Sequence, residues 1–466
     1  MLDMIILDAH EAELRAALTT ADGSEAAAYL LFGSAEIAAD PWTQTPRRRL
    51  VSRRVLSIPP EDFISASGVH VTWSTRGFVK LLKQAEQEGL IAAIVHTHPG
   101  GTAYFSEQDD RNERDLLGIV TNRSGNGHSF ASVVLGGDGS IAARLWTSPG
   151  TVEPCRRVLV TGRRICLHVS EKTVHANESL DRQARLFGPT FNPTIRALRV
   201  GIVGCGGTGS PTAMMLARLG VGGLLLVDDD VIELTNLNRV HGARRSDADT
   251  KTPKVEVLAR EIRSADLGVE VSTFRGWVGD DRARDALRSC DIIFGCTDDH
   301  DGRLFLNRFA YFYGIPVIDM GLRMMPARGD RPYEMAARVT VVAPGTPCLL
   351  CRGLVVPSLA AEEALRRTDP AEYERRKAEA YVIGGGDPAP AVVTFTTETA
   401  CMAINELLQA LTLFRGGEAM KPERRRRFDT VDDRSTTVKP RIECEMCAGT
   451  GVWGLGDVEP FLHRMG

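Results

Sequence analysis

The stretch 196–230 constrains the fold of this chain more than any other part of it. It reads RALRVGIVGCGGTGSPTAMMLARLGVGGLLLVDDD, which has the pattern of an apolar strand, a glycine-rich turn, a helix and a second apolar strand that ends in aspartates. This order is typical of a parallel βαβ unit, whose sheet is buried on both faces. We therefore predict an α/β domain with a mainly parallel sheet.

A second domain is expected because 466 residues are roughly two to three times the length of an ordinary domain. Residues 1–150 have the pattern of a smaller α/β unit, in which the helix-like TRGFVKLLKQAEQEG is followed by the buried-strand pattern LIAAIVHTHP. We predict a first domain over 1–150, a connecting segment 151–176 whose membership the sequence leaves open, and a second domain over 177–466.

Composition excludes several classes of partner. The formal net charge of -4 gives no reason to expect nucleic acid or an anionic membrane. No stretch approaches the roughly 18 apolar residues of a membrane span, and the acidic start MLDMIILDAHEAEL lacks the basic segment of a signal peptide. We therefore expect a cytoplasmic protein, whose ten cysteines are free thiols, metal ligands or nucleophiles rather than disulfides.

Two histidines lie where the strand LIAAIVHTHP ends. Because side chains on a strand alternate with period two, His96 and His98 point the same way and can bind one ion, to which Asp109 adds an oxygen ligand. Three protein ligands leave a fourth position for water, as in a catalytic zinc site. We predict Glu25 as the general base for that water and Ser106 as a donor to the developing oxyanion. The alternative is an ordinary polar loop, because HxH alone is common.

The glycine turn has the spacing G-x-G-x-x-G, and two acids end the next strand, where they can hold ribose hydroxyls. These residues are Gly204, Gly206, Gly209, Asp228 and Asp230. An NAD-linked dehydrogenase is the default alternative for such a pocket. Three later residues favour ATP instead, because they suit neutralisation of a triphosphate and placement of Mg2+ rather than hydride transfer. They are Arg239, Lys254 and Asp298.

Four cysteines form two CxxC pairs, Cys348 with Cys351 and Cys444 with Cys447. Two thiolate pairs supply the four soft ligands of a tetrahedral structural zinc, which leaves no room for water. We favour this structural site over redox chemistry of the CxxC pairs.

The N-terminal set resembles the signature of the JAMM (JAB/MPN) metalloproteases, which has the order Glu, HxHP, Ser and Asp. Here these are Glu25, the segment 96–99, Ser106 and Asp109. The resemblance implies that Glu25 is the general base and that His96, His98 and Asp109 hold zinc, with Ser106 supporting the tetrahedral intermediate. It also implies a substrate in which a peptide or isopeptide bond follows a ubiquitin-like tail.

The second half resembles the adenylating family of ubiquitin-activating enzymes and their relatives in thiamine and molybdopterin biosynthesis. The match includes GCGGTGS, DDDVIELTNLNR, KTPKVEVLAREI and CTDDHDGRLFLN. It implies a Rossmann-like, mainly parallel-sheet domain with a four-cysteine zinc clip, which binds ATP and Mg2+. The implied site residues are Gly204, Gly206, Gly207, Gly209, Asp228, Asp230, Asn236, Arg239, Lys254 and Asp298, with Arg182 inserted by the neighbouring subunit of a homodimer. Val240 departs from the family, which has glutamine after the arginine.

The pair of domains resembles fusions encoded in bacterial ubiquitin-like conjugation operons. We therefore expect adenylation of a ubiquitin-like protein and zinc-dependent processing or removal of the same modifier, with a conjugating-enzyme-like partner. Two alternatives stay open: activation of a sulfur-carrier protein, or a half that only docks the modifier. Because Cys401 lies in an apolar helix-like run, we predict a packed core thiol there and no thioester.

Overall fold

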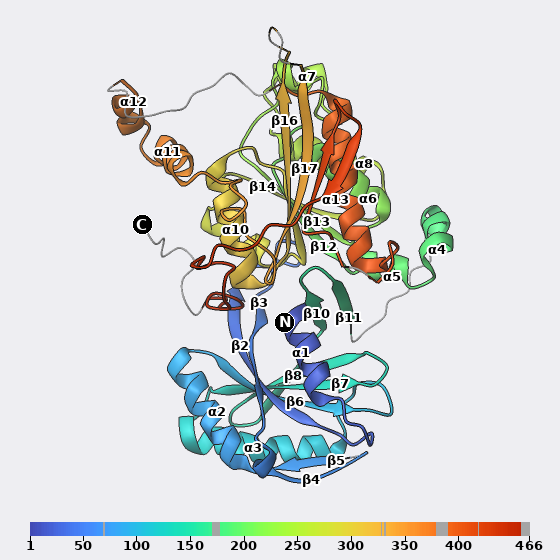
Figure 1. Ribbon diagram of the computed structural model, residues 1–466, viewed down its shortest axis with the longest axis vertical. Coiled ribbons are helices and arrows are strands. Elements are labelled where there is room, and N and C mark those ends of the chain that lie inside the picture. Colours follow the sequence, from blue (N-terminus) through green and yellow to red (C-terminus); the bar gives the residue numbers. More distant parts are fainter. Residues whose placement is uncertain are drawn as a thin grey trace.

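The computed structural model describes residues 1–68, 70–169, 178–327, 329, 332–378, 390–417 and 419–457. Each half of the chain builds its own β-sheet, and Figure 1 shows the sheet of the first half below that of the second.

The first sheet has nine strands in the order β11-β10-β1-β3-β2-β6-β7-β8-β9. The strands are β1 (Leu2–Leu7), β2 (Ala27–Ile37), β3 (Arg47–Ser57), β6 (Ile91–His98), β7 (Ser129–Gly136), β8 (Ile141–Thr147), β9 (Thr151–Pro154), β10 (Arg157–Thr161) and β11 (Ile165–Val169). Three helices belong to this half: α1 (Asp8–Leu18), α2 (Thr75–Glu88) and α3 (Glu107–Ser124). A separate hairpin consists of β4 (Phe63–Ser67) and β5 (His70–Trp73), preceded by a 3-10 turn, Pro60–Asp62.

Helix α2 shows how the local sequence sets these elements. The hydroxyl of Ser74 accepts a hydrogen bond from the Arg76 amide at its start, and Gly89, with a φ of 66°, ends it in the left-handed conformation. Phe78, Leu82 and Ala85 recur at helical spacing and are buried. The helix that the sequence predicts here is therefore present.

The second sheet has eight strands in the order β14-β13-β12-β15-β16-β17-β18-β19. They are β12 (Arg199–Val203), β13 (Gly223–Asp228), β14 (Glu270–Arg275), β15 (Ile292–Gly295), β16 (Val317–Met325), β17 (Glu334–Val342), β18 (Glu423–Arg427) and β19 (Asp432–Ser435). The helices are α4 (Asp181–Phe187), α5 (Phe191–Arg196), α6 (Gly209–Leu219), α7 (Arg245–Asp249), α8 (Lys254–Ser264), α9 (Asp281–Leu287), α10 (His300–Tyr313), α11 (Pro357–Thr368), α12 (Pro370–Ala378) and α13 (Val393–Thr412). Two 3-10 turns span Glu178–Leu180 and Leu234–Asn236.

The predicted α/β class and βαβ unit are confirmed. Strands β12 and β13, which α6 connects in the sequence, pair in parallel with each other. Strands β14, β15 and β16 continue the parallel part of the sheet. Strands β9, β10 and β11 belong to the first sheet, where β10 pairs in parallel with β1. Residues 151–169, whose membership the sequence left open, therefore lie in the N-terminal sheet, and 170–177 lie outside the described residues.

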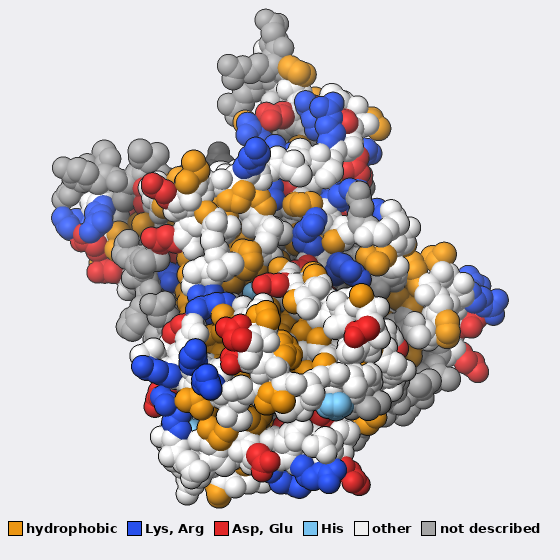
Figure 2. Space-filling view, turned by 60° about the horizontal axis from the view of Figure 1, so that its bottom comes forward, with side chains coloured by type: hydrophobic (Ala, Val, Ile, Leu, Met, Phe, Trp, Pro, Cys, Tyr) orange, Lys and Arg blue, Asp and Glu red, His pale blue; other side chains and the backbone are white. Residues whose placement is uncertain are grey.

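The surface is of mixed charge on the face that Figure 2 presents, where acidic and basic side chains are interspersed and apolar ones gather between them. This agrees with the small net charge of -4. Within the described ranges, every helix is too short or too polar to cross a membrane.

A buried ion network joins the two halves at the amino ends of the parallel strands. The Asp291 carboxylate, at the start of β15, accepts from Arg157 at 2.6 Å and from Arg49 at 3.2 Å. Burial disfavours the charged carboxylate, but Arg157 and Arg49 outweigh it and lower the pKa of Asp291. Arg199, at the start of β12, pairs at 2.9 Å with Asp40 of the first half. The contact is thus specific as well as buried.

Apolar packing and the C-terminal segment complete this contact. Ile5, Leu7, Val51 and Leu159 of the first sheet lie in the same hydrophobic cluster as the core of the second domain. Residues 450–457 then run along the first sheet, where the Asp457 amide donates to the Ser34 carbonyl at 2.7 Å. The two halves therefore pack as one unit.

We predict that Asp291→Asn destabilises the protein by about 3–5 kcal/mol, because it removes the nearest charge partner of two buried guanidinium groups. Arg49 and Arg157 then keep only the more distant Asp3 carboxylate, at 3.6 and 3.8 Å. The measurement is the denaturant dependence of unfolding. Asp281→Asn, at a side chain that is 78% exposed, is the matched control and is expected to change little. Equal stability of the two variants would contradict a stabilising role for the network.

Candidate metal and nucleotide sites

The structure brings His96, His98 and Asp109 together at the end of β6 and the start of α3. One ligand atom from each residue lies within 4.8 Å of the others. His96 Nε2 is 3.2 Å from Asp109 Oδ1, and His98 Nε2 is 3.9 Å from Asp109 Oδ2. All three side chains are mostly buried. This group therefore presents two nitrogens and one oxygen to one point.

Asp109 is held by the start of its own helix. Ser106 is the N-cap of α3, and both its amide and its hydroxyl donate to Asp109 Oδ2 at 2.7 Å. The Asp109 amide donates back to the Ser106 hydroxyl at 3.2 Å, which completes a capping box. These hydrogen bonds and His96 outweigh the effect of burial and hold the pKa of Asp109 below its usual value. Oδ1 is left facing His96.

Glu25 lies two residues before β2 and reaches the same point. Its Oε1 is 3.8 Å from His98 Nε2, and its amide donates to the carbonyl of Ser67 in the β4–β5 hairpin at 2.7 Å. Burial raises the pKa of Glu25 and lowers the pKa of His98. A carboxylate that takes up a proton more readily suits a general base, and a neutral imidazole suits a metal ligand.

The donor set fits a catalytic zinc. His96 Nε2 is buried, and although it lies 3.2 Å from Asp109 Oδ1 it makes no well-aligned hydrogen bond within the described residues, so it is available to a metal ion. Two imidazoles and one carboxylate are a known ligand set for a catalytic zinc, with a fourth position for water. The residues present therefore match the ion that the sequence predicts.

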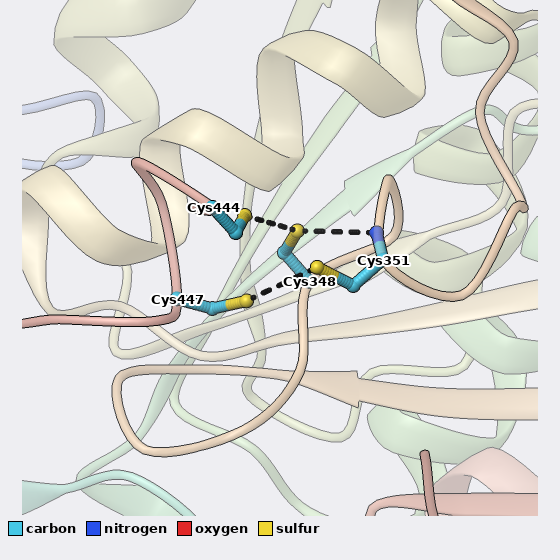
Figure 3. Close-up of side chains that lie close together, drawn as sticks. All are labelled: Cys348, Cys351, Cys444 and Cys447. Carbon is cyan, nitrogen blue, oxygen red and sulfur yellow. Dashed lines mark hydrogen bonds between the residues drawn. The ribbon is translucent and has the colours of Figure 1, made fainter. Parts of the chain in front are cut away.

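The four cysteines of the predicted zinc clip come together, as Figure 3 shows, from the loop after β17 and from the C-terminal segment. Cys348 Sγ lies 3.6 Å from Cys444 Sγ, and Cys351 Sγ lies 3.5 Å from Cys447 Sγ. Zinc–sulfur bonds of about 2.3 Å place tetrahedral ligands about 3.8 Å apart, whereas a disulfide needs about 2.05 Å. The predicted clip is confirmed as a cluster that fits zinc.

The glycine turn between β12 and α6 needs glycine at two of its positions. Gly204 has a φ of +91°, and a Cβ there would lie 2.8 Å from the Cys296 carbonyl group. A Cβ on Gly209 would lie 1.8 Å from the Gly204 oxygen. At Gly206 a Cβ would have nothing within 4 Å, so the turn is open there, and at Gly207 it would approach Arg239 to 3.3 Å. An open backbone before a helix start suits an anionic ligand.

Acids and a lysine surround this turn. Asp228 accepts from the Cys205 amide at 2.5 Å and from the Asp230 amide at 2.8 Å, so it holds the turn as well as facing it. Lys254 Nζ lies 2.6 Å from Asp230 Oδ2. Burial opposes the charge on Lys254, but Asp228 and Asp230 outweigh it and raise its pKa. Asp229, the middle residue of the run DDD and the one to which the sequence analysis gave no role, joins the other two aspartates in one cluster.

The remaining predicted residues of the nucleotide site differ in burial and lie on separate segments of the second domain. Asn236 is buried and accepts from the Glu233 amide at 3.1 Å, and Arg239 donates to the Thr235 carbonyl at 2.6 Å. Asp298 is exposed beyond the end of β15, and Arg182 is exposed on α4. Val240, at the position of the family's glutamine, packs with Ile232 and Val257 in a small apolar cluster, which explains the loss of the polar residue.

Cys401 lies on α13, as predicted, but its side chain is only half-buried. Its Sγ contacts Met215 Sδ of α6 at 3.6 Å, and burial raises the pKa of the thiol. Of the predicted crossover 352–388, residues 379–388 lie outside the described ranges.

A glycine turn at the carboxyl end of a parallel sheet and a His-His-Asp group on a second sheet define a two-domain α/β class of protein with a candidate nucleotide site and a candidate metal site. The ThiF family model matches residues 180–447, and the model for prokaryotic homologs of the JAB domain matches residues 7–148. The chain belongs to the ThiF family and carries an N-terminal JAB domain.

Several characterised proteins are similar to this chain in part. The SAMP-activating enzyme E1 of Haloferax volcanii is 32% identical over 179 residues, which cover 37% of this chain and 61% of that protein. The sulfur carrier protein ThiS adenylyltransferase of Bacillus subtilis is 30% identical over 164 residues, which cover 35% and 46%. The chain thus spans less than two thirds of these relatives. The crystal structure of E. coli MccB with ATP has a TM-score of 0.42 and 19% identity, with 58% of this chain and 75% of that chain covered.

We predict that the full chain binds two zinc ions and that His96→Ala combined with His98→Ala removes one of them. The four-cysteine zinc stays because its ligands lie in the other domain. Metal analysis of the purified variants tests this. Cys444→Ser is the reciprocal variant, expected to weaken the other zinc. An unchanged zinc content in the double histidine variant would remove the zinc assignment.

Proposed function

We propose that this chain is a bifunctional enzyme of a bacterial, cytoplasmic ubiquitin-like modification system. One site adenylates the C-terminus of a ubiquitin-like protein with ATP, and the other cleaves the bond that follows the same tail. The observation that carries the proposal is the His-His-Asp group with Glu25 beside it, in a chain whose second domain belongs to the ThiF family. The family resemblance supplies the modifier as the common substrate.

For adenylation, the tail carboxylate attacks the α-phosphorus of ATP and pyrophosphate leaves, so that an acyl-adenylate forms. The open turn at Gly206 accommodates the phosphates of ATP. Asp228 and Asp230 contact the ribose and the metal-bound phosphates. Lys254, already charged and close to Asp230, neutralises phosphate oxygens. Mg2+, for which Asp298 is the proposed ligand, supplies further charge neutralisation when bound.

Three further residues complete the proposed adenylation site. Asn236 and Arg239 contact the phosphates from the loop after β13. Arg182 acts on the neighbouring subunit of a homodimer, a role that its exposed place on α4 permits.

For cleavage, Glu25 accepts a proton from the attacking water and passes it to the leaving amine. Zinc, held by the two histidines and Asp109, supplies Lewis acidity when bound. Ser106 is the proposed donor to the oxyanion, and in the structure its hydroxyl donates to Asp109. Because this hydroxyl has one proton, donation to the oxyanion replaces its bond to Asp109, whose Oδ2 still accepts from the Ser106 amide.

The alternatives are activation of a sulfur carrier and a half that only docks the modifier. One of the two relatives named above is a SAMP-activating enzyme and the other adenylylates the sulfur carrier protein ThiS, so the first alternative shares the adenylation step. A JAB domain on the same chain favours a modification system, because a reversible conjugate needs a peptidase. The filled ligand positions favour catalysis over docking.

After adenylation we propose direct transfer to a conjugating-enzyme-like partner or another acceptor, with no thioester at Cys401. The raised pKa of this thiol and its contact with Met215 make it a weak nucleophile.

We predict that exchange of pyrophosphate into ATP requires the modifier. We also predict that exchange is lost in Asp298→Ala, because this variant lacks the carboxylate that is proposed to bind the Mg2+ beside the phosphates. The exchange assay uses labelled pyrophosphate and the full chain. The double histidine variant is the control and keeps full exchange, since its changes lie in the other domain. Exchange that proceeds without any modifier would instead indicate a small-molecule acid as substrate.

We predict that Glu25→Gln keeps both zinc ions but cleaves a modifier fusion 10²- to 10⁴-fold more slowly, the usual contribution of a general base. Rates are measured with the modifier joined to a reporter by its tail. Glu36→Gln, at an exposed acid on the far part of β2, is the matched control. Cleavage by Glu25→Gln at the wild-type rate would contradict the assigned base.

A further inference from the structure

Arg144 on β8 makes three close contacts with the start of α3. Its Nη1 lies 2.6 Å from Asp110 Oδ1, and its Nε lies 2.7 Å from Glu113 Oε2. Its guanidinium carbon lies 3.8 Å from the centre of the Phe105 ring, in cation–π contact. The side chain is 10% exposed. A single buried side chain therefore binds this turn at three points.

These contacts lie on both sides of the capping box. Phe105 directly precedes Ser106, and Asp110 directly follows Asp109. Ser106 donates a hydrogen bond to Asp109 Oδ2, and Asp109 Oδ1 faces His96. The position of the helix start therefore decides where Oδ1 lies. Within the part of the chain that the structure describes, Arg144 binds Asp110 and Glu113 and lies over the rings of Phe105 and Trp146, so it holds the helix start through residues other than the two histidines.

Glu113 anchors the other end of this arrangement. It is 1% exposed and accepts hydrogen bonds from Ser132 at 2.6 Å and from the indole of Trp146. Strands β7 and β8 thereby hold α3 through one carboxylate. Two carboxylates on one guanidinium also leave no net positive charge beside a cation site.

We propose that Arg144 is a positioning residue that sets the zinc affinity of the His96–His98–Asp109 site by fixing Asp109. The proposal rests on the peptidase site proposed above. Groups that orient a metal ligand typically change metal affinity by about 10- to 100-fold when they are altered. A role in stability alone would change the unfolding temperature and leave zinc affinity as it is.

The test compares three variants of the full chain. Arg144→Lys keeps a charge near Glu113 but loses the planar group that stacks on Phe105 and reaches Asp110. Asp110→Asn removes only the exposed end of the arrangement, at a side chain that is 38% exposed, and is expected to fold. Asp115→Asn removes an exposed acid from the same helix and is the matched control.

Two quantities are measured for each variant: the loss of zinc as the chelator concentration is raised, and the midpoint of thermal unfolding. The double histidine variant shows which part of the zinc loss comes from the His96–His98–Asp109 site. We expect about 10- to 100-fold weaker zinc in Arg144→Lys, a smaller loss in Asp110→Asn, and no change in Asp115→Asn or at the four-cysteine zinc.

Three results would overturn the inference. Zinc affinity in Arg144→Lys and Asp110→Asn equal to that in Asp115→Asn would show that Arg144 does not position the ligand. A parallel loss of the four-cysteine zinc would show general unfolding. A wild-type chain that binds only the four-cysteine zinc would overturn the proposed peptidase itself, a result distinct from the other two.

Discussion

The buried carboxylate of Asp291 is the interaction on which the arrangement of the whole molecule depends. It binds Arg157 and Arg49 from the N-terminal sheet and the Arg199 amide from its own sheet. Such a group is stable only when all its partners are in place, because a buried charge without a partner is costly. The JAB domain is therefore docked in one orientation on the ThiF domain rather than tethered to it.

This docking decides where the two sites lie. Ala27 of β2 pairs with His96, and Ser34 of the same strand contacts the C-terminal segment. At roughly 3.3 Å per residue, Ser34 lies about 23 Å from Ala27 along the strand. The glycine turn begins at Gly204, at the carboxyl end of β12, whereas the docking contacts lie at the amino end, at Arg199. Each site thus faces away from the contact between the domains.

Both sites rely on a backbone turn that a short carboxylate holds in place. Asp109 accepts from the amide and hydroxyl of Ser106, and Asp228 accepts from the Cys205 amide in the glycine turn. In each case hydrogen bonds to backbone amides orient the group that faces the ligand. The same residues therefore serve the fold and the proposed chemistry.

The sequence by itself determined the α/β class, the βαβ unit and the helix α2, because spacing, glycine positions and hydrophobic period act over short distances. The two CxxC pairs are also local patterns, and their meeting across 96 residues was predicted from the four thiolates that a structural zinc needs. Only the tertiary structure decided that 151–169 completes the first sheet, that Asp291 joins the domains and that Arg144 binds Asp110 beside the metal-site residue Asp109. Each of these depends on residues far apart in the chain, whose pairing no local pattern records.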